Sequence, residues 1–154
     1  MDRGKTKLAS LGLCGVFAVL AIGVALLTGG VYQRCAERAD RNYACRTALS
    51  YVTNQLRRGD RAGAVSLARL EDRTALRIDQ EEGYALWLYC WDGAFRELYA
   101  AVDGDFGPSD GEALFSMEAF DVDLEGSRVS FTLTDGDGTA YSARLWLRCG
   151  EGAA

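Results

Sequence analysis

The stretch LASLGLCGVFAVLAIGVALLTGGVYQ, residues 8–33, decides how the rest of this chain can fold, because it contains no charged residue. A transmembrane helix needs about 20 consecutive apolar residues, and this stretch is longer than that. The apolar region of a cleaved signal peptide is shorter, roughly 7–15 residues. The stretch therefore predicts a retained transmembrane helix over 8–33.

The segment before this stretch, residues 1–7, is a short basic leader that contains Arg3, Lys5 and Lys7 against Asp2. Basic flanks favour the cytoplasmic side of a membrane, and long domains are translocated largely regardless of their charge. We therefore expect a single-pass protein of the cell membrane, with a cytoplasmic N-terminus and a C-terminal head outside.

A helical pattern continues beyond the apolar stretch. Cys45, Leu49, Val52 and Leu56 follow one another at spacings of four, three and four, which places them on one face of a helix. No proline precedes residue 58, and Gly59 supplies a stop signal. We predict a stalk helix over 34–58 that continues the span.

From residue 64 onward the apolar residues alternate with polar ones, which is typical of strands with one face on a core. Asp-Gly pairs at 92–93 and 135–138 are hairpin signals, and 103–112 is a long loop. We predict an antiparallel β head over 64–149, a disordered tail over 150–154, and an α+β fold in which the head packs on the stalk stripe. The expected strands cover 64–70, 74–79, 84–91, 94–102, 119–124, 128–134 and 139–149.

The composition argues against several classes of function. The chain has no histidine, so it lacks Ser-His-Asp and Cys-His arrangements and the commonest metal ligand. Its net charge is −5 and its basic residues are interspersed with acidic ones, which argues against a nucleic-acid partner. We predict no enzyme activity, no catalytic or metal-binding residues and no cofactor.

Two acidic loops are candidates for calcium sites. Asp135, Asp137 and Gly138 resemble the start of a calcium loop, but the twelfth position is Trp146 instead of the closing glutamate. A hairpin connection is therefore the favoured interpretation there, and a solvated loop is favoured for the aspartates of 103–112.

The five cysteines allow few disulfides. Cys35 and Cys45 lie ten residues apart on one helix, too far apart to bond within a chain. Cys45 could reach Cys90 or Cys149 if either strand crosses the stalk, so we predict at most one such pair.

Two sets of residues are candidates for contacts with partners. Small residues let membrane helices approach closely, and the apolar stretch holds five glycines: Gly12, Gly15, Gly23, Gly29 and Gly30. Trp87, Tyr89 and Trp91 share one face of the expected strand at 84–91. Burial in a central strand is the first interpretation, and a partner surface is the alternative if that face is open.

One N-terminal helix, half membrane and half stalk, cradled by an antiparallel sheet resembles the architecture of type IV pilins and pseudopilins. The segment VYQRCAERADRNYACRTALSYVTNQLRR, residues 31–58, also resembles the stalk of an uncharacterised pilin-like family of Gram-positive bacteria. The resemblance implies a pilin-like fold and a non-catalytic subunit of an envelope filament, secretion or DNA-uptake machine. Its implied partners are the membrane and other pilin-like subunits or itself, through the N-terminal helix.

The chain departs from the pilin pattern at one position. Pilins carry a glutamate five residues into the apolar segment, whereas no acidic residue lies between Asp2 and Glu37 here. This departure favours a minor pilin or pseudopilin over a major fibre subunit. The alternative hypothesis is a membrane-tethered extracytoplasmic binding or sensing domain that does not polymerise.

Overall fold

The computed structural model describes the backbone of residues 3–149 and the side chains of residues 12–24 and 43–149. The chain begins with one helix, α1 (Arg3–Arg58), and forms two compact units, residues 1–40 and 41–154. The first unit contains the N-terminal part of α1. The predicted disordered tail over 150–154 lies outside the described residues.

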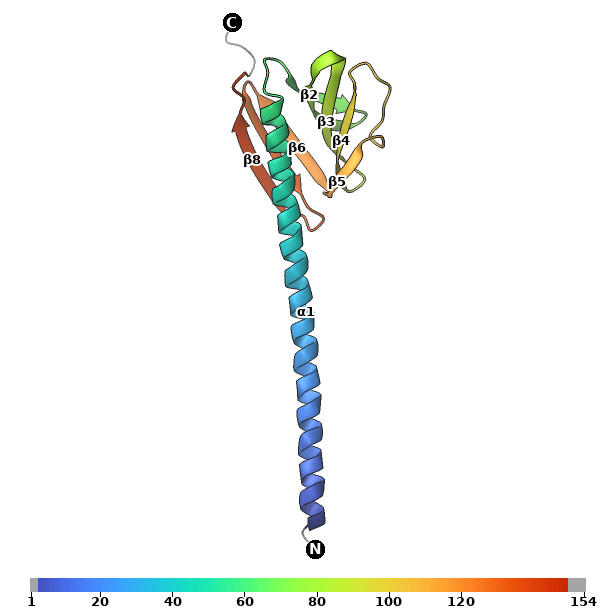
Figure 1. Ribbon diagram of the computed structural model, residues 1–154, viewed down its shortest axis with the longest axis vertical. Helices are drawn as coiled ribbons and strands as arrows, with labels where there is room; N and C mark the ends of the chain where they lie inside the picture. Colours follow the sequence, from blue (N-terminus) through green and yellow to red (C-terminus); the bar gives the residue numbers. More distant parts are fainter. Residues whose placement is uncertain (1–2, 150–154) are drawn as a thin grey trace. The chain divides into compact units, whose positions relative to one another are not determined.

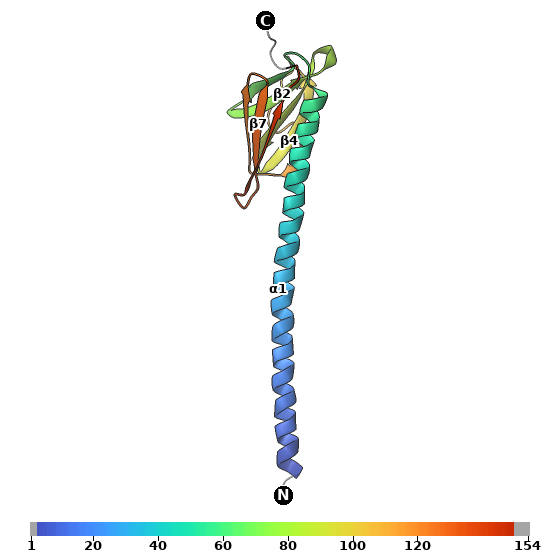
Figure 2. The ribbon, with the colours of Figure 1, turned by 90° about the vertical axis from the view of Figure 1, so that its left-hand side faces the viewer.

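The second unit contains the last turns of α1 and eight strands in two antiparallel sheets (Figures 1 and 2). The first sheet has the order β1-β2-β3-β4-β5 and the second has the order β6-β7-β8. A short 3₁₀ helix, η1 (Glu81–Gly83), precedes β3. The strands are β1 (Val65–Leu70), β2 (Arg73–Asp79), β3 (Tyr84–Trp91), β4 (Ala94–Ala101), β5 (Glu112–Ser116), β6 (Ala119–Glu125), β7 (Arg128–Thr134) and β8 (Ala140–Trp146).

The strand β3 is the centre of the five-stranded sheet. It pairs with β2 and with β4, and it is apolar on both faces, as expected of a strand covered on both sides. Asp92 and Gly93 join β3 to β4 with φ angles of 50° and 68°, the left-handed conformation that tight hairpin turns require. The sequence Asp-Gly at this position therefore sets the register of the β3–β4 hairpin.

The main core lies between the two sheets and one face of α1. Cys45, Ala48, Val52 and Leu56 are each at most 1% exposed, and their spacing of three, four and four places them on one helix face. The sheets contribute the alternate residues of their inner faces: Leu76, Ile78, Leu86, Leu88, Phe95, Phe120, Val129, Phe131 and Leu133. Burial of this stripe joins the last turns of α1 to the head.

Contacts of α1 with β4 and β5 are polar as well as apolar. The Tyr51 hydroxyl donates a hydrogen bond to the carboxylate of Glu97, and Gln55 Nε2 donates to Tyr51 Oη at 2.7 Å. The Tyr51 ring meets the Phe115 ring edge-on with 6.2 Å between centroids. Burial and the Glu97 carboxylate raise the pKa of Tyr51 to about 12.

A second, smaller core covers the opposite face of the five-stranded sheet. Its buried members are Leu70, Ala75, Ala85, Trp87 and Tyr89. The loop over 102–111 packs on it, with the Phe106 ring 5.2 Å from the Trp87 ring and the Tyr89 hydroxyl donating to the Pro108 carbonyl at 3.0 Å. Gly111, at the end of this loop, lies against the Tyr89 side chain, and a Cβ at this position would lie 2.2 Å from Tyr89 Oη.

The predicted fold class needs correction. A membrane span and stalk packed on a single antiparallel head sheet, in a pilin-like arrangement, is wrong, because the head has two sheets that share no strand. Among the described residues, no helix is both long enough and apolar enough to cross a membrane. The physical reason for two sheets is that the inner faces of β2–β4 and β6–β8 are both apolar, so they bury each other as well as α1.

The strand β5 is not among the strands predicted from the sequence. β5 has five residues with no buried side chain, and it follows a loop whose composition is rich in Gly and Asp. Its pairing with β4 shifts register between Phe95 and Arg96. A short, half-exposed strand of this kind gives no clear alternation.

Candidate interaction surface

The outward face of the three-stranded sheet is a polar surface made of aligned rows. Phe120, Val122 and Leu124 of β6 point inward, so Asp121, Asp123 and Glu125 point outward. The same alternation applies to β7 and β8. The strand register therefore defines three outward rows across the sheet: Asp121–Thr132–Ser142, Asp123–Ser130–Arg144 and Glu125–Arg128–Trp146.

Charge changes sign from one side of this face to the other. Asp121, Asp123 and Glu125 on β6 are all exposed, and we call them the acidic strip. Arg144 and Trp146 on β8, with Arg148 just beyond it, are also exposed, and we call them the basic–aromatic strip. The middle strand, β7, contributes Thr132, Ser130 and Arg128 to this face. The Thr132 hydroxyl oxygen lies 2.9 Å from that of Ser142 on β8, and the Arg128 guanidinium donates to the Glu125 carboxylate.

The basic–aromatic strip ends in an open groove of ≈ 860 Å³ between β8 and the end of α1. The groove is lined by Arg57, Asp60, Arg144, Leu145, Trp146, Arg148 and Cys149. Asp60 accepts hydrogen bonds from the backbone N–H groups of Arg148 at 2.7 Å and Cys149 at 3.0 Å. These bonds hold the chain after β8 against the segment that follows α1. The net charge of the groove lining is positive, because its arginines outnumber Asp60.

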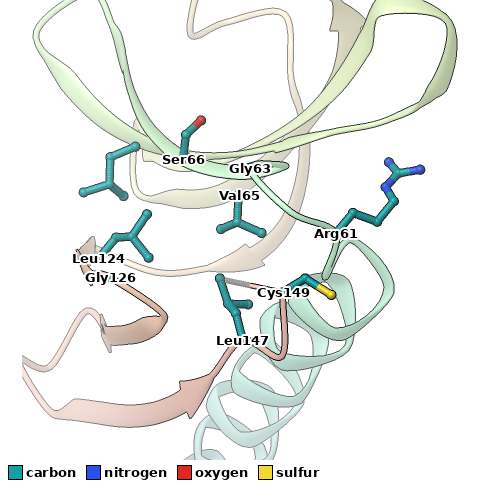
Figure 3. Close-up of a pocket in the computed structure, with 9 residues that line it drawn as sticks. Arg61, Gly63, Val65, Ser66, Leu124, Gly126, Leu147 and Cys149 are labelled. Carbon is teal, nitrogen blue, oxygen red and sulfur yellow. The ribbon is translucent and has the colours of Figure 1, made fainter. Parts of the chain in front are cut away.

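A smaller cavity of ≈ 320 Å³ lies where β1 approaches the β6–β7 turn. Val65, Leu124 and Leu147 surround it, and Arg61 and Cys149 lie at its side near the end of α1 (Figure 3). Arg61 is held by other groups: Nη2 donates to the Asp79 carbonyl at 2.6 Å, and Nη1 lies 3.5 Å from the Glu81 carboxylate. The cavity therefore has a mixed lining, with polar as well as apolar surface.

The described cysteines are free thiols, so the structure contains no disulfide between Cys45 and Cys90 or Cys149. Cys45 Sγ lies 3.9 Å from Met117 Sδ, and Cys90 Sγ lies 3.8 Å from the Met117 carbonyl oxygen. Burial raises the pKa of Cys45 and raises that of Cys90 to about 12, whereas Cys149 is exposed.

We expect these thiols to differ strongly in reactivity. The thiolate is the reactive form, so buried thiols with raised pKa values should react with a maleimide at least about a hundredfold more slowly than Cys149. The measurement is mass spectrometry of the folded chain after brief labelling at pH 7.5, with the urea-unfolded chain as control. Fast labelling of Cys45 or Cys90 in the folded chain would contradict the burial described here.

The glycines predicted to pack in a membrane are only partly described. A Cβ added at Gly12, Gly15 or Gly23 would meet no described atom within 4 Å beyond the nearby backbone of the helix itself. Large apolar side chains around them are strongly exposed, with Leu13 at 73% and Phe17 at 75%. Gly29 and Gly30 lie outside the residues whose side chains are described.

The three aromatic residues predicted as an optional partner surface lie together on β3. Trp87 is 6% exposed and Tyr89 is 0% exposed, because both lie in the smaller core under the 102–111 loop. Trp91 is half-buried, and the Arg96 guanidinium carbon lies 4.9 Å from its ring centroid. Trp87 and Tyr89 are therefore buried in a central strand and do not form an open partner surface.

The Asp-Gly-Asp-Gly connection is a hairpin turn. Asp135 Oδ1 accepts hydrogen bonds from the N–H groups of Asp137 at 3.0 Å and Thr139 at 2.9 Å, so this buried carboxylate organises its own turn. Across the described part of the chain, no three His, Cys, Asp or Glu side chains are grouped closely enough to hold a metal ion.

The two charged strips were not among the functional residues predicted from the sequence. Their signal was present, since Asp121 and Asp123 alternate with apolar residues on one segment and Arg144 and Arg148 do so on another. Alternation predicts that both segments are strands, but it does not show which edges of one sheet they occupy. Their position on the two sides of β7 is what turns scattered charges into a surface.

A model of a protein family described as a domain of unknown function (DUF4860) matches residues 43–136, which is more than half of the chain. The match begins in the last turns of α1 and covers β1 to β7. Neither the curated proteins nor the solved structures contain a match to this chain.

Proposed function

The chain belongs to the DUF4860 family of domains of unknown function, and we propose that it is a non-catalytic subunit of an envelope filament, secretion or DNA-uptake machine. In this proposal the N-terminal helix holds the chain at the cell membrane and packs against neighbouring subunits, while the head lies outside the cell. The subunit acts through its surfaces and not through a reaction.

The observation that carries the proposal is the exposed apolar surface of α1 between residues 12 and 24. Its large apolar side chains are 59–75% exposed: Leu13, Val16, Phe17, Val19, Leu20, Ile22 and Val24. Apolar surface of this extent is unfavourable in water and marks a site of contact with lipid or protein. The uncharged sequence over 8–33 makes lipid and other apolar helices the suitable surroundings.

The two polar strips of the head support a role in assembly. A filament subunit needs head surfaces that recognise other heads, and exposed Trp and Arg side chains are enriched in protein interfaces. Trp146 is 64% exposed and lies beside Arg144 and Arg148. These residues are suited to a contact surface.

The test is cysteine crosslinking of the full chain in cells. Single cysteines are placed at positions 12–24 in a chain whose Cys14, Cys35 and Cys149 are replaced by serine or alanine. A subunit that packs laterally through this helix should give crosslinks that recur every three to four residues. Cysteines at the exposed positions Tyr43 and Ser50 serve as matched controls beyond the apolar segment.

The same experiment addresses the alternative, a membrane-tethered binding domain that does not polymerise. The observation favouring that alternative is the groove beside Trp146, which is large enough for a ligand. A chain that is expressed and sediments with membranes but gives no crosslinks over 12–24 would overturn the assembly proposal. A periodic set of crosslinks would support it.

A further inference from the structure

We propose that the head pairs with a second copy of itself through the outward face of β6–β8, with the acidic strip of each copy on the basic–aromatic strip of the other. The inference deepens the proposed function by naming a head contact between subunits. It depends on that function for the high local concentration described below.

β6 and β8 have the same outward spacing. Outward residues of a strand repeat every two positions, or about 6.6–6.8 Å. The acidic strip has Asp123 in its middle row, and β8 has Arg144 in the same row, with Trp146 in the row of Glu125, which is already paired with Arg128. Arginine and carboxylate pair in bidentate geometry, and an exposed Trp is a common anchor of interfaces.

Charge selects one of two ways in which the faces could meet. A two-fold axis parallel to the strands places β8 of one copy over β6 of the other and keeps the rows in the same order. The row Asp123–Ser130–Arg144 then lies on the same row of the second copy, so Arg144 faces Asp123 of that copy and Asp123 faces its Arg144.

A two-fold axis across the strands gives the opposite result. It places β8 over β8 and β6 over β6, so that arginines face arginines and carboxylates face carboxylates. Like charges placed directly opposite each other are unfavourable across an interface. The charge pattern therefore favours the arrangement in which the strands of the two copies run in the same direction, with the small angle usual for packed sheets.

The size of the face sets the strength of the contact. Three strands of seven residues cover roughly 14 Å by 23 Å, on the order of 300 Å² on each copy. A stable interface in solution usually buries about 800 Å² on each partner, so heads released from a membrane should pair only weakly. Subunits held on one membrane or in one filament face a high effective concentration, which is where we expect the pair to form.

A single cysteine on the central strand tests the arrangement in the full chain in its membrane. Ser130 lies in the middle row of β7, so the proposed axis places it opposite Ser130 of the second copy. With Cys14, Cys35 and Cys149 replaced, and the buried Cys45 and Cys90 kept, Ser130→Cys should give a disulfide-linked dimer on mild oxidation. Thr74→Cys, an exposed position on β2 of the other sheet, should give none.

Charge exchange provides the decisive comparison. In the Ser130→Cys chain, Arg144→Glu or Asp123→Arg should each lower the dimer yield about tenfold, because like charges then face each other. Both substitutions in one chain should restore the yield, as should coexpression of the two single variants. Arg69→Glu, an exposed arginine on β1, is the matched control and should change nothing.

An unchanged dimer yield in Arg144→Glu, or no recovery in the combined variant, would overturn the inference. The helix crosslinks over 12–24 are measured in the same cells. Helix crosslinks without the head dimer would reject the head contact and leave the proposed function standing. A head dimer without helix crosslinks would support the contact and overturn lateral packing of the helix.

Discussion

Replacing Phe131 with alanine is expected to lower the free energy of unfolding of the head by about 3–5 kcal/mol. Phe131 lies on β7, is 2% exposed, and its ring centroid is 6.2 Å from that of Phe120. The Phe120 ring in turn meets the Phe95 ring of the first sheet at 5.2 Å. Loss of the Phe131 ring leaves a cavity at the centre of the contact between the two sheets.

Urea unfolding of the full chain, followed by tryptophan fluorescence, measures this effect. The matched control is Ser130→Ala, the adjacent residue on the opposite face of the same strand, which should change stability by about 0.5 kcal/mol or less. A loss below about 1 kcal/mol for Phe131→Ala would mean that the sheets do not depend on this contact.

Local elements of the head could be predicted because their signals are local. Val129, Phe131 and Leu133 alternate with polar residues, and this pattern alone predicts a strand with its inner and outer faces assigned. The Asp92-Gly93 turn predicts a hairpin because a left-handed conformation is needed at both positions. Each inference uses only residues that are neighbours in the sequence.

The division into two sheets could not be predicted in the same way. β5 and β6 are separated only by Met117 and Glu118, yet β5 pairs with β4 and β6 pairs with β7. Alternation shows that a segment is a strand but does not identify its hydrogen-bonding partner. A single antiparallel sheet and two packed sheets therefore produce the same sequence pattern.

The charged face has the same limitation. Asp123 and Arg144 are far apart in the sequence and reach the same row only through their common neighbour, Ser130. The packing of the 102–111 loop on Trp87 is equally non-local, because Phe106 reaches the sheet from the middle of a polar segment and meets the Trp87 ring edge-on. Surfaces made by register become visible only once strand pairing is known.

Placing a charge in the apolar stripe of α1 is expected to have an effect as large as the loss of Phe131. Val52 is 0% exposed among the apolar side chains of the main core, so Val52→Asp would bury a carboxylate without a partner. An uncompensated buried charge costs about 3–5 kcal/mol. We expect the head to lose its packing on α1, which urea unfolding and limited proteolysis would both detect.

The pH dependence of this loss separates burial of a charge from loss of volume. Burial raises the pKa of an introduced carboxyl above its unfolded value of about 3.9. The loss of stability relative to the unsubstituted chain should therefore be full above the raised pKa and should shrink as pH falls from 8 to 5. Val52→Asn and Val52→Ala are the matched neutral controls, and their deficits should not follow pH in this way. If the Val52→Asp deficit is the same at pH 8 and pH 5, the carboxyl is in water, and Val52 does not face the core that joins α1 to the two sheets.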